Sequence, residues 1–358
     1  MNHRENMLRA LKRDNPRQVP FEFTLCPALL EEFKKRTGRQ DYENYYGFPF
    51  RYINLNKTRQ KIDYSIYYDN LPGNAAPLHW NPEWGVMGLT GSLAHFQEML
   101  HPLEKFKTPD QIDQYPFPDF NEDYRWQGVR EQVQKMIAHD LVAVAPMQMT
   151  VFEVSWYLRG MDTFMLDLMC NKEFAHALMD KITDIRIGMA RRFARCGADI
   201  LMLGDDVATQ LDMMLSPDLW RSALKPRLER IIQAARREKP DILIFYHCDG
   251  NVQKIIPELI EIGIDILNPV QPECMNPYQL KQWYGDRLSF WGAVGTQSVL
   301  PFGRPEEIKQ TCKLLIERVG KGGGLLLAPT HVIEPDVPWE NLQTFIDAVK
   351  EYGLVKGG

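Results

Sequence analysis

The chain has 358 residues, of which 44% are hydrophobic and 25% are charged, and its 42 Lys and Arg against 47 Asp and Glu give a net charge of −5 at pH 7. Binding to nucleic acid needs a basic surplus on one surface, so this acidic balance argues against that class of function. The length fits either two domains or one large α/β barrel of about 250 residues or more.

The sequence predicts a cytoplasmic protein that does not bind membranes. No apolar run approaches the roughly 20 residues that cross a bilayer, and the first residues, MNHRENMLRALKRDNP, are charged where a signal peptide would be apolar. The six cysteines are scattered along the chain, which argues against a disulfide framework. A chemical role for Cys248 or Cys274 stays open beside the alternative that both are small buried hydrophobic residues.

The first 140 residues predict little regular structure. We expect a helix over residues 2–12, a short strand over residues 19–23, and long connecting segments rich in aromatic residues, Pro and Asn. Segments of this kind often form the cover or the walls of a site.

From residue 141 onward, short apolar runs alternate with longer amphipathic segments. Because the runs lack polar alternation, we interpret each as a strand buried on both faces. They are LVAVAP (141–146), DILMLG (199–204), DILIFYHC (241–248), DILNPV (265–270), LSFWGAVG (288–295) and GLLLAP (324–329).

The segments between these runs predict helices. One carries a single apolar stripe at steps of three and four, formed by Phe174, Leu178, Ile182, Ile185, Met189 and Phe193. Others are expected to begin at Ser216-Pro217, Pro305 and Pro338, and two to end at Gly320 and Gly353 in the left-handed conformation.

Repeated strand-then-helix units favour a parallel (β/α)8 TIM barrel with an N-terminal extension covering the barrel mouth. We expect one domain over residues 1–358, irregular over 1–140 and regular over 141–353. A doubly wound sheet is the weaker alternative, because the glycine cluster at 320–324 follows a helix and precedes a strand, which is the wrong order for a phosphate loop.

Active sites of such barrels form where the strands end. The residues just after the predicted strands are unusually polar, namely Gln148, Asp205, Asp206, His247, Asp249, Gln271, Glu273, Gln297 and His331.

Three of these residues suggest a metal site. His247 and Asp249 are two positions apart on an extended strand end, so their side chains point the same way, and His331 could complete a three-ligand zinc site with an open position. Glu273, Gln271 or Cys274 could add a fourth ligand. The alternative is a site without metal, in which the histidines hydrogen-bond a substrate.

Asp205 and Asp206 are adjacent, so an extended backbone sends them to opposite sides and only one should face the mouth. That carboxylate could act as a general base, orient a ligand or bind a cationic group, and the alternative is an N-terminal cap or a charge partner for the following loop. Trp156 and Tyr157 offer flat surfaces for a substrate, although such residues more often pack in a core.

Four segments of the chain are similar to those of the uroporphyrinogen decarboxylase superfamily: EVSWYLRG at 153–160, GDD at 204–206, HCDGN at 247–251 and LLLAPTHVIEPDVPWENL at 325–342. The resemblance implies a (β/α)8 barrel. It also implies one of two activities, the decarboxylation of haem synthesis or cobamide-dependent methyl transfer.

The resemblance favours the methyltransferase branch. The decarboxylase binds substrate carboxylates through early arginines, whereas the matching stretch here, residues 19–27, has no arginine and carries Glu22. Trp156 and Asp206 also stand where the decarboxylase has a tyrosine and a serine. The methyltransferases hold zinc with a His-x-Cys pair and a later Cys, and these positions correspond here to His247, Asp249 and His331.

A His/Asp/His set is a harder group of ligands than His/Cys/Cys, and it suits oxygen or nitrogen substrates better than thiols. The resemblance therefore implies metal-assisted transfer of a methyl group between a small methoxylated or methylamine-like compound, or a methyl acceptor, and a corrinoid (methylcobalamin) carried by a partner protein. A homodimer is compatible with the sequence.

Roles follow for the candidate residues. The predicted metal ligands are His247, Asp249, His331 and Glu273. The predicted catalytic residues are Asp206, Asp205 and His331, and the predicted substrate-binding residues are Glu22, Gln148, Trp156, Tyr157, Gln271 and Gln297. Two alternatives stay open: a metal-free decarboxylase of a carboxylated aromatic or tetrapyrrole-like substrate, and a non-catalytic corrinoid- or tetrapyrrole-binding protein.

Overall fold

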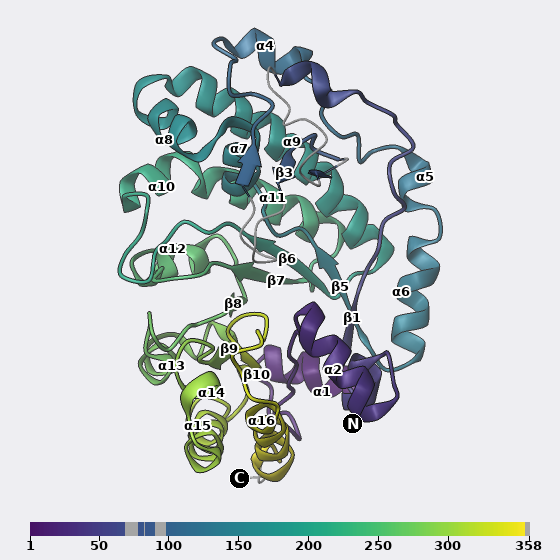
Figure 1. The fold of residues 1–358 in the computed structure, drawn as a ribbon, viewed down its shortest axis with the longest axis vertical. Coiled ribbons are helices and arrows are strands. Elements are labelled where there is room, and N and C mark those ends of the chain that lie inside the picture. The colour runs from purple at the N-terminus through teal and green to yellow at the C-terminus, as the bar shows by residue number, and fades with distance from the viewer. Residues whose placement is uncertain (69–77, 82, 90–97, 355–358) are drawn as a thin grey trace.

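The computed structural model describes residues 1–68, 78–81, 83–89 and 98–354. Its centre is a parallel seven-stranded sheet, in which all six predicted runs form strands (Figure 1). The order in space is β1 (Phe50–Tyr52), β5 (Val142–Pro146), β6 (Ile200–Gly204), β7 (Leu243–His247), β8 (Ile266–Asn268), β9 (Ser289–Val294) and β10 (Leu325–Pro329).

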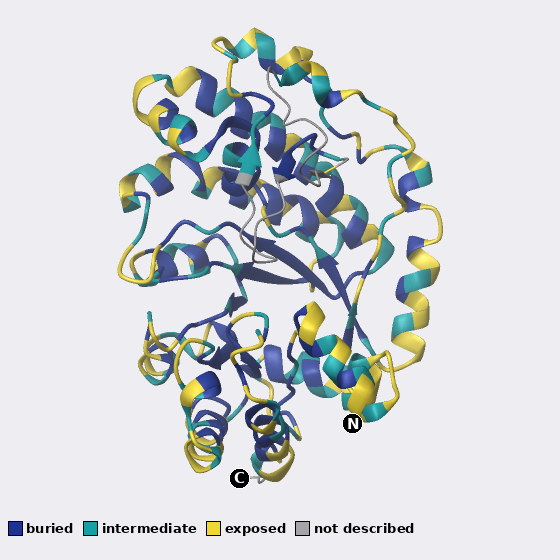
Figure 2. Ribbon diagram, viewed as in Figure 1, coloured by how far each residue is buried: buried dark blue, intermediate teal, exposed yellow. Residues whose placement is uncertain are grey.

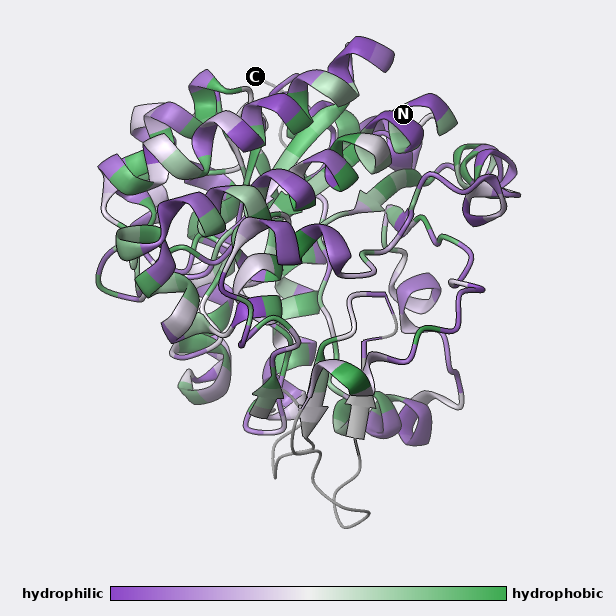
Figure 3. Cartoon of the chain, turned by 90° about the horizontal axis from the view of Figure 1, so that it is seen from above, coloured by the Kyte–Doolittle hydropathy of each residue, from purple (hydrophilic) through white to green (hydrophobic). Residues whose placement is uncertain are grey.

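Helices link successive strands and surround the sheet. They are α6 (Val129–Ala138), α7 (Phe152–Arg159), α8 (Met161–Cys170), α9 (Lys172–Cys196), α10 (Pro217–Ala223), α11 (Lys225–Glu238), η2 (Gln253–Ile255), α12 (Ile256–Glu261), α13 (Pro277–Tyr284), α14 (Val299–Phe302), α15 (Pro305–Arg318) and α16 (Trp339–Tyr352). The predicted stripe on α9 is largely buried, and the outer helix faces are exposed and hydrophilic (Figures 2 and 3). This is the alternation of a (β/α)8 barrel.

Ring contacts across the interior show that the sheet is curled. Trp291 of β9 contacts Phe50 of β1, with ring centroids 5.1 Å apart, and Phe245 of β7, at 5.3 Å. These three strands are not neighbours in the sheet, so their rings can meet only in the interior of a curled sheet. Met7 and Leu11 of α1 (His3–Leu11) join the same buried cluster.

The segment predicted as a strand over residues 19–23 lies at the β10 edge of the curled sheet. It runs parallel beside β10, with one bridge between Phe21 and Leu327 and a second between Leu25 and Ile333. The prediction of a regular strand is wrong, because the pairing is limited to these isolated bridges. The predicted α/β barrel is confirmed.

The N-terminal part is more regular than expected. It contains α2 (Pro27–Thr37), α3 (Tyr42–Tyr46), η1 (Tyr64–Tyr67), α4 (Pro109–Gln114) and α5 (Asp123–Trp126), and an antiparallel sheet of β2 (Leu78–Trp80), β3 (Met87–Leu89) and β4 (Glu98–Leu100). His101 follows this sheet, and its Nδ1 lies 2.7 Å from the carbonyl oxygen of Tyr157 on α7. The three-stranded sheet is therefore followed directly by a contact with α7, the helix that comes after β5.

The predicted helix starts are confirmed, but the left-handed conformation expected at Gly320 and Gly353 is wrong. Ser216 caps α10 through a hydrogen bond from the Leu219 N–H. Gly353 has φ −65° instead of a left-handed value, so it ends α16 in the right-handed region. The left-handed glycines of this part of the chain are Gly322, Gly323 and Gly324, which form the turn before β10.

Within the described ranges, no helix combines the length and the apolarity needed to span a bilayer.

Candidate functional site

Three titratable side chains meet at the carboxyl ends of β6 and β7. Asp206 lies two residues past the end of β6, His247 ends β7, and Asp249 follows two residues later. One ligand atom from each lies within 4.8 Å of the others. The two-residue spacing puts the side chains of His247 and Asp249 on one face, as the sequence predicts.

The orientation of His247 is fixed from behind. Its Nδ1 lies 2.6 Å from Oδ1 of Asn268, the last residue of β8, and Nδ2 of Asn268 donates to the carbonyl oxygen of Trp291 at 2.8 Å. Since a carbonyl oxygen can only accept, the group of Asn268 that faces Trp291 must be its NH2, and its oxygen therefore faces the His247 ring. Nδ1 of His247 must then carry the proton. The lone pair is then on Nε2, which lies 3.7 Å from Oδ1 of Asp206.

The two carboxylates are arranged for a cation. The backbone N–H of Asp249 donates to Oδ1 of Asp206 at 2.7 Å. Within the described part of the chain, Oδ1 of Asp249 is buried and accepts no hydrogen bond. Burial raises the pKa of Asp249, and the charge of Asp206 adds to this effect, whereas His247 and His331 oppose it. A bound divalent cation would satisfy this oxygen and relieve the repulsion between the two acids.

The donor set fits a metal of moderate hardness. One imidazole nitrogen and two carboxylate oxygens suit zinc and similar divalent ions, and three protein ligands leave a coordination position open. In this respect the residues present are consistent with a catalytic metal site.

Asp205 lies behind this site. It is fully buried and faces away from the mouth, and its carboxylate accepts hydrogen bonds from the backbone N–H groups of Val151 and Glu153, each at 3.0 Å. Burial raises its pKa to about 6, and the backbone hydrogen bonds oppose the shift. Asp205 thus caps the start of α7, a helix that precedes it in the chain, whereas the alternative considered from the sequence is a cap or charge partner for the loop that follows it.

Glu153 is a site residue that the sequence did not reveal. It lies in the first turn of α7, and its Oε2 accepts a hydrogen bond from the Asp206 N–H at 3.2 Å. Burial, and then the charges of Asp205 and Asp206, raise its pKa to about 9. Acidic residues are common in the first turn of a helix, where they interact favourably with the helix dipole. The only signal for Glu153 in the sequence is therefore its place in the EVSWYLRG segment.

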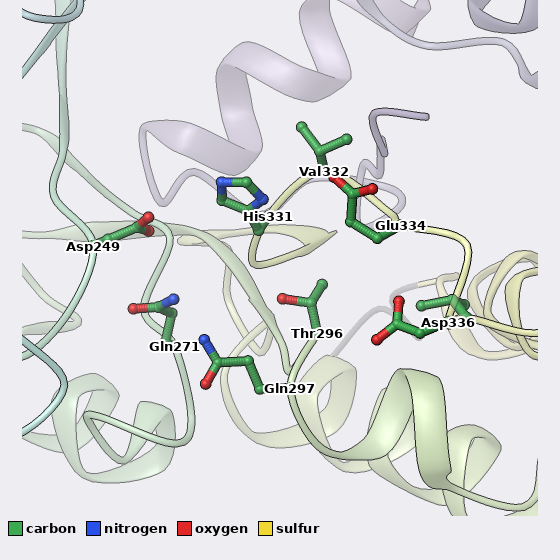
Figure 4. Close-up of a pocket in the computed structure, with 9 residues that line it drawn as sticks. Asp249, Gln271, Thr296, Gln297, His331, Val332, Glu334 and Asp336 are labelled. Atoms are coloured by element: carbon green, nitrogen blue, oxygen red, sulfur yellow. The ribbon is translucent and has the colours of Figure 1, made fainter. Parts of the chain in front are cut away.

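A cavity of about 300 Å³ opens beside Asp249. Figure 4 shows its polar lining, with Asp249 on one side, Glu334 and Asp336 on the opposite side, and His331 between them. The lining residues are Asp249, Gln271, Thr296, Gln297, His331, Val332, Glu334, Asp336 and Val337.

The other predicted residues have varied positions. His331 lines the cavity, but it is not part of the three-residue cluster. Oε1 of Glu273 accepts a hydrogen bond from the Ser298 hydroxyl, and Glu273 also lies outside that cluster. Gln271 accepts the Gly250 N–H at 2.6 Å, and Gln297 accepts a hydrogen bond from Gln210.

Trp156 and Tyr157 pack against each other on α7, with ring centroids 4.2 Å apart. The Tyr157 hydroxyl lies 3.5 Å from a Glu153 oxygen. The side chain of Gln148, which follows β5, is partly buried. None of these three is among the residues that line the cavity.

Glu22 points into the barrel interior. It accepts a hydrogen bond from the indole Nε1 of Trp291 at 3.0 Å, and burial raises its pKa to about 7 despite that bond. A carboxylate in this position would repel a polyacidic ligand.

Backbone strain gathers at the same strand ends. Val270, which lies two residues after the end of β8, has a φ of 54°. Ala293, which lies within β9, has a φ of 74°. A left-handed conformation is unfavourable for a β-branched residue such as Val270, and strain of this kind, about 1–3 kcal/mol per residue, concentrates at functional sites.

Comparison with known proteins gives the family. The model of the family described as Uroporphyrinogen decarboxylase (URO-D) matches residues 95–352. The chain is 26% identical over 216 residues to the methylcobamide:CoM methyltransferase MtaA of Methanosarcina barkeri, covering 60% of this chain and 55% of that protein. It is 24% identical over 216 residues to a methylated-thiol–coenzyme M methyltransferase of Methanosarcina mazei, covering 59% and 54%.

Decarboxylases are matched as well. The uroporphyrinogen decarboxylase of Christiangramia forsetii is 25% identical over 252 residues, which covers 68% of this chain and 70% of that protein. The match spans only about half the length of the two methyltransferases.

A solved structure confirms the fold over almost the whole chain. A methyltransferase from Methanosarcina mazei superposes with a TM-score of 0.65 at 20% identity, covering 98% of this chain and 99% of the other. The family model covers well over half of the residues and agrees with the resemblance carried by the motifs. The chain belongs to the uroporphyrinogen decarboxylase (URO-D) family.

Proposed function

We propose that this protein is a methyltransferase that moves a methyl group between a small oxygen- or nitrogen-containing compound and a corrinoid carried by a partner protein. Asp206, His247 and Asp249 would hold a divalent metal ion, with zinc as the first candidate. The observation that carries the proposal is that these three side chains converge and that one of their oxygens, the buried Oδ1 of Asp249, receives no hydrogen bond from the described residues.

Charge separates this proposal from decarboxylation of a polyacid. Asp206, Asp249 and Glu22 bring carboxyl groups to the mouth or the interior of the barrel. The buried Arg186 already donates to the carbonyl oxygens of Met149 and Thr150, so these two donors are not free for a substrate carboxylate. An anionic substrate with several carboxylates would meet repulsion here.

When bound, the metal would act as a Lewis acid that polarises the reacting heteroatom of the small molecule. The residues of the chain prepare that chemistry. Asn268 holds His247 in the tautomer whose Nε2 carries the free lone pair. Asp206 positions Asp249 by accepting a hydrogen bond from the Asp249 backbone N–H. His331 reaches the cavity beside Asp249 and can accept or hold a proton of the small molecule.

The test combines metal analysis with a methyl-transfer assay. Protein purified without added metal or chelator is expected to contain about one zinc or similar ion per chain, measured by plasma mass spectrometry. It is also expected to transfer a methyl group between free cobalamin and methoxylated or methylamine-like compounds, followed by the cobalamin absorbance.

Two other results would contradict the proposal. Release of CO2 from a carboxylated compound by metal-free protein would support the decarboxylase alternative. Tight cobalamin binding without turnover, unchanged in the variants His247→Ala and Asp249→Ala, would support a non-catalytic binding protein.

Asn268 provides a sharper prediction about the proposed metal. The substitution Asn268→Leu keeps the volume but removes the acceptor for His247 Nδ1, and loss of such an outer partner typically costs about 10- to 100-fold in metal affinity. We expect this loss in a zinc titration that competes the protein against a chromophoric chelator. Asn268→Asp retains an acceptor oxygen and should bind zinc more tightly than Asn268→Leu.

Thermal melts of the metal-free variants serve as the control for folding. Equal zinc affinity in Asn268→Leu and the unaltered protein, with both folded, would show that Asn268 has no role in presenting His247.

A further inference from the structure

The cavity beside the proposed metal site has acidic groups at both of its sides. Asp249 lies on one side, and Glu334 and Asp336 lie on the opposite side, on the segment between β10 and α16 (Figure 4). The amides of Gln271 and Gln297 and the hydroxyl of Thr296 line the space between. The carboxylates of Asp249, Glu334 and Asp336 supply hydrogen-bond acceptors at the two sides of the cavity, whereas the amide oxygens of Gln271 and Gln297 already accept hydrogen bonds from the Gly250 N–H and from Gln210.

Positive charge is nearly missing from this lining. Among the described residues that line the cavity there is no Lys or Arg, and His331 supplies the only imidazole. The buried Arg186 is not among the described lining residues, and its Nη2 and Nε donate to the carbonyl oxygens of Met149 at 2.7 Å and Thr150 at 3.1 Å.

The negative charge of the carboxylates would be neutralised at one side of the cavity and not at the other. At the inner side, a divalent ion held by Asp206, His247 and Asp249 would neutralise the two carboxylates. At the outer side, Asp336 is exposed to solvent. A ligand that spans the cavity therefore meets a neutralised inner end and an acidic outer end.

From this arrangement we infer that the small molecule carries a protonated amine at a distance from its reacting atom. The inference rests on the proposed function, because it takes the inner end as the reacting end. The amine is a primary, secondary or tertiary ammonium, since its N–H groups can donate to the carboxylate oxygens of the lining. A quaternary ammonium fits less well, because it is held mainly by aromatic faces, and no aromatic ring is among the described lining residues.

Three probes of similar size and different charge test the inference. They are 2-methoxyethylamine, which is a cation at pH 7, neutral 2-methoxyethanol, and the anion methoxyacetate. Binding to the protein with its metal as purified is measured by isothermal titration calorimetry or by ligand-observed NMR, without any corrinoid. We expect the amine to bind at least tenfold more tightly than the alcohol, and methoxyacetate to bind more weakly than either.

A matched pair of variants locates the effect. Asp336→Asn is expected to reduce the preference for the amine over the alcohol by about threefold to tenfold and to leave binding of the alcohol unchanged. The same exchange at Asp286, an exposed residue before β9 at the opposite end of the barrel, should leave the preference intact. Since both residues are on the surface, neither exchange should prevent folding.

The outcomes separate this inference from the proposed function. Equal binding of amine and alcohol, tighter binding of methoxyacetate, or an unchanged preference in Asp336→Asn would overturn the charge assignment, even if methyl transfer to cobalamin were observed. A preference for the amine that Asp336→Asn removes would support the charge assignment, and absence of methyl transfer in the same preparation would then count against the proposed function alone.

Discussion

The substitution Asp249→Asn is expected to remove bound metal from the purified protein and to lower its zinc affinity by more than the roughly 100-fold that loss of an outer-shell partner can cost. The reason is the buried Oδ1 of Asp249, which lies in the Asp206/His247/Asp249 cluster and has no hydrogen-bond donor within the described residues. An amide in its place supplies no negative charge. The measurement is metal content per chain, followed by a competitive zinc titration and the methyl-transfer assay.

Three further variants distinguish the ligands. His247→Gln should lose the metal as Asp249→Asn does, whereas Glu273→Gln should retain it, because Glu273 accepts a hydrogen bond from Ser298 and is not part of the cluster. His331→Gln should keep most of the metal and lose activity, since His331 lines the cavity without joining the cluster. Full metal loss in His331→Gln would instead support the ligand set expected from the sequence. Retention of metal by Asp249→Asn would contradict the site.

The second large effect concerns stability. Asp205→Ala is expected to lower the free energy of unfolding by about 3 kcal/mol, because two buried backbone N–H groups at the start of α7 lose their acceptor, at about 1–3 kcal/mol each. Asp205→Asn keeps an acceptor oxygen and should cost less. Urea unfolding followed by circular dichroism measures both changes.

The neighbouring residue is the control for this prediction. Asp206 is partly exposed at the mouth and accepts one backbone hydrogen bond, from Asp249. Asp206→Ala should therefore cost about 1 kcal/mol or less in stability, yet abolish metal binding. Equal destabilisation by the two exchanges would show that the cap on α7 does not contribute as the contacts imply.

Local pattern explains what could be predicted. The six apolar runs are long enough and sufficiently uniform to identify β5 to β10, and parallel strands bring their carboxyl ends to one place. The alternation of side chains then predicts that His247 and Asp249 share a face and that Asp205 and Asp206 do not. Each of these predictions depends on residues close together in the sequence.

The missed features depend on contacts through space. Glu153 becomes a site residue only because β6 places Asp206 against the start of α7, and Asn268 matters only because β8 lies beside β7. The left-handed backbone at Val270 and Ala293 is equally unpredictable, since neither residue type favours it. The three-stranded sheet of the N-terminal part was missed because its strands are only three residues long.

The segment beside β10 has a consequence for how the chain reaches its native state. Phe21 and Leu327 are about 300 residues apart in sequence, yet they are bridge partners. Closing so long a loop is entropically slow, and contacts of this kind form after local ones. During synthesis the N-terminal segment must wait until β10 leaves the ribosome, so the barrel stays open along this edge until almost the whole chain has been made.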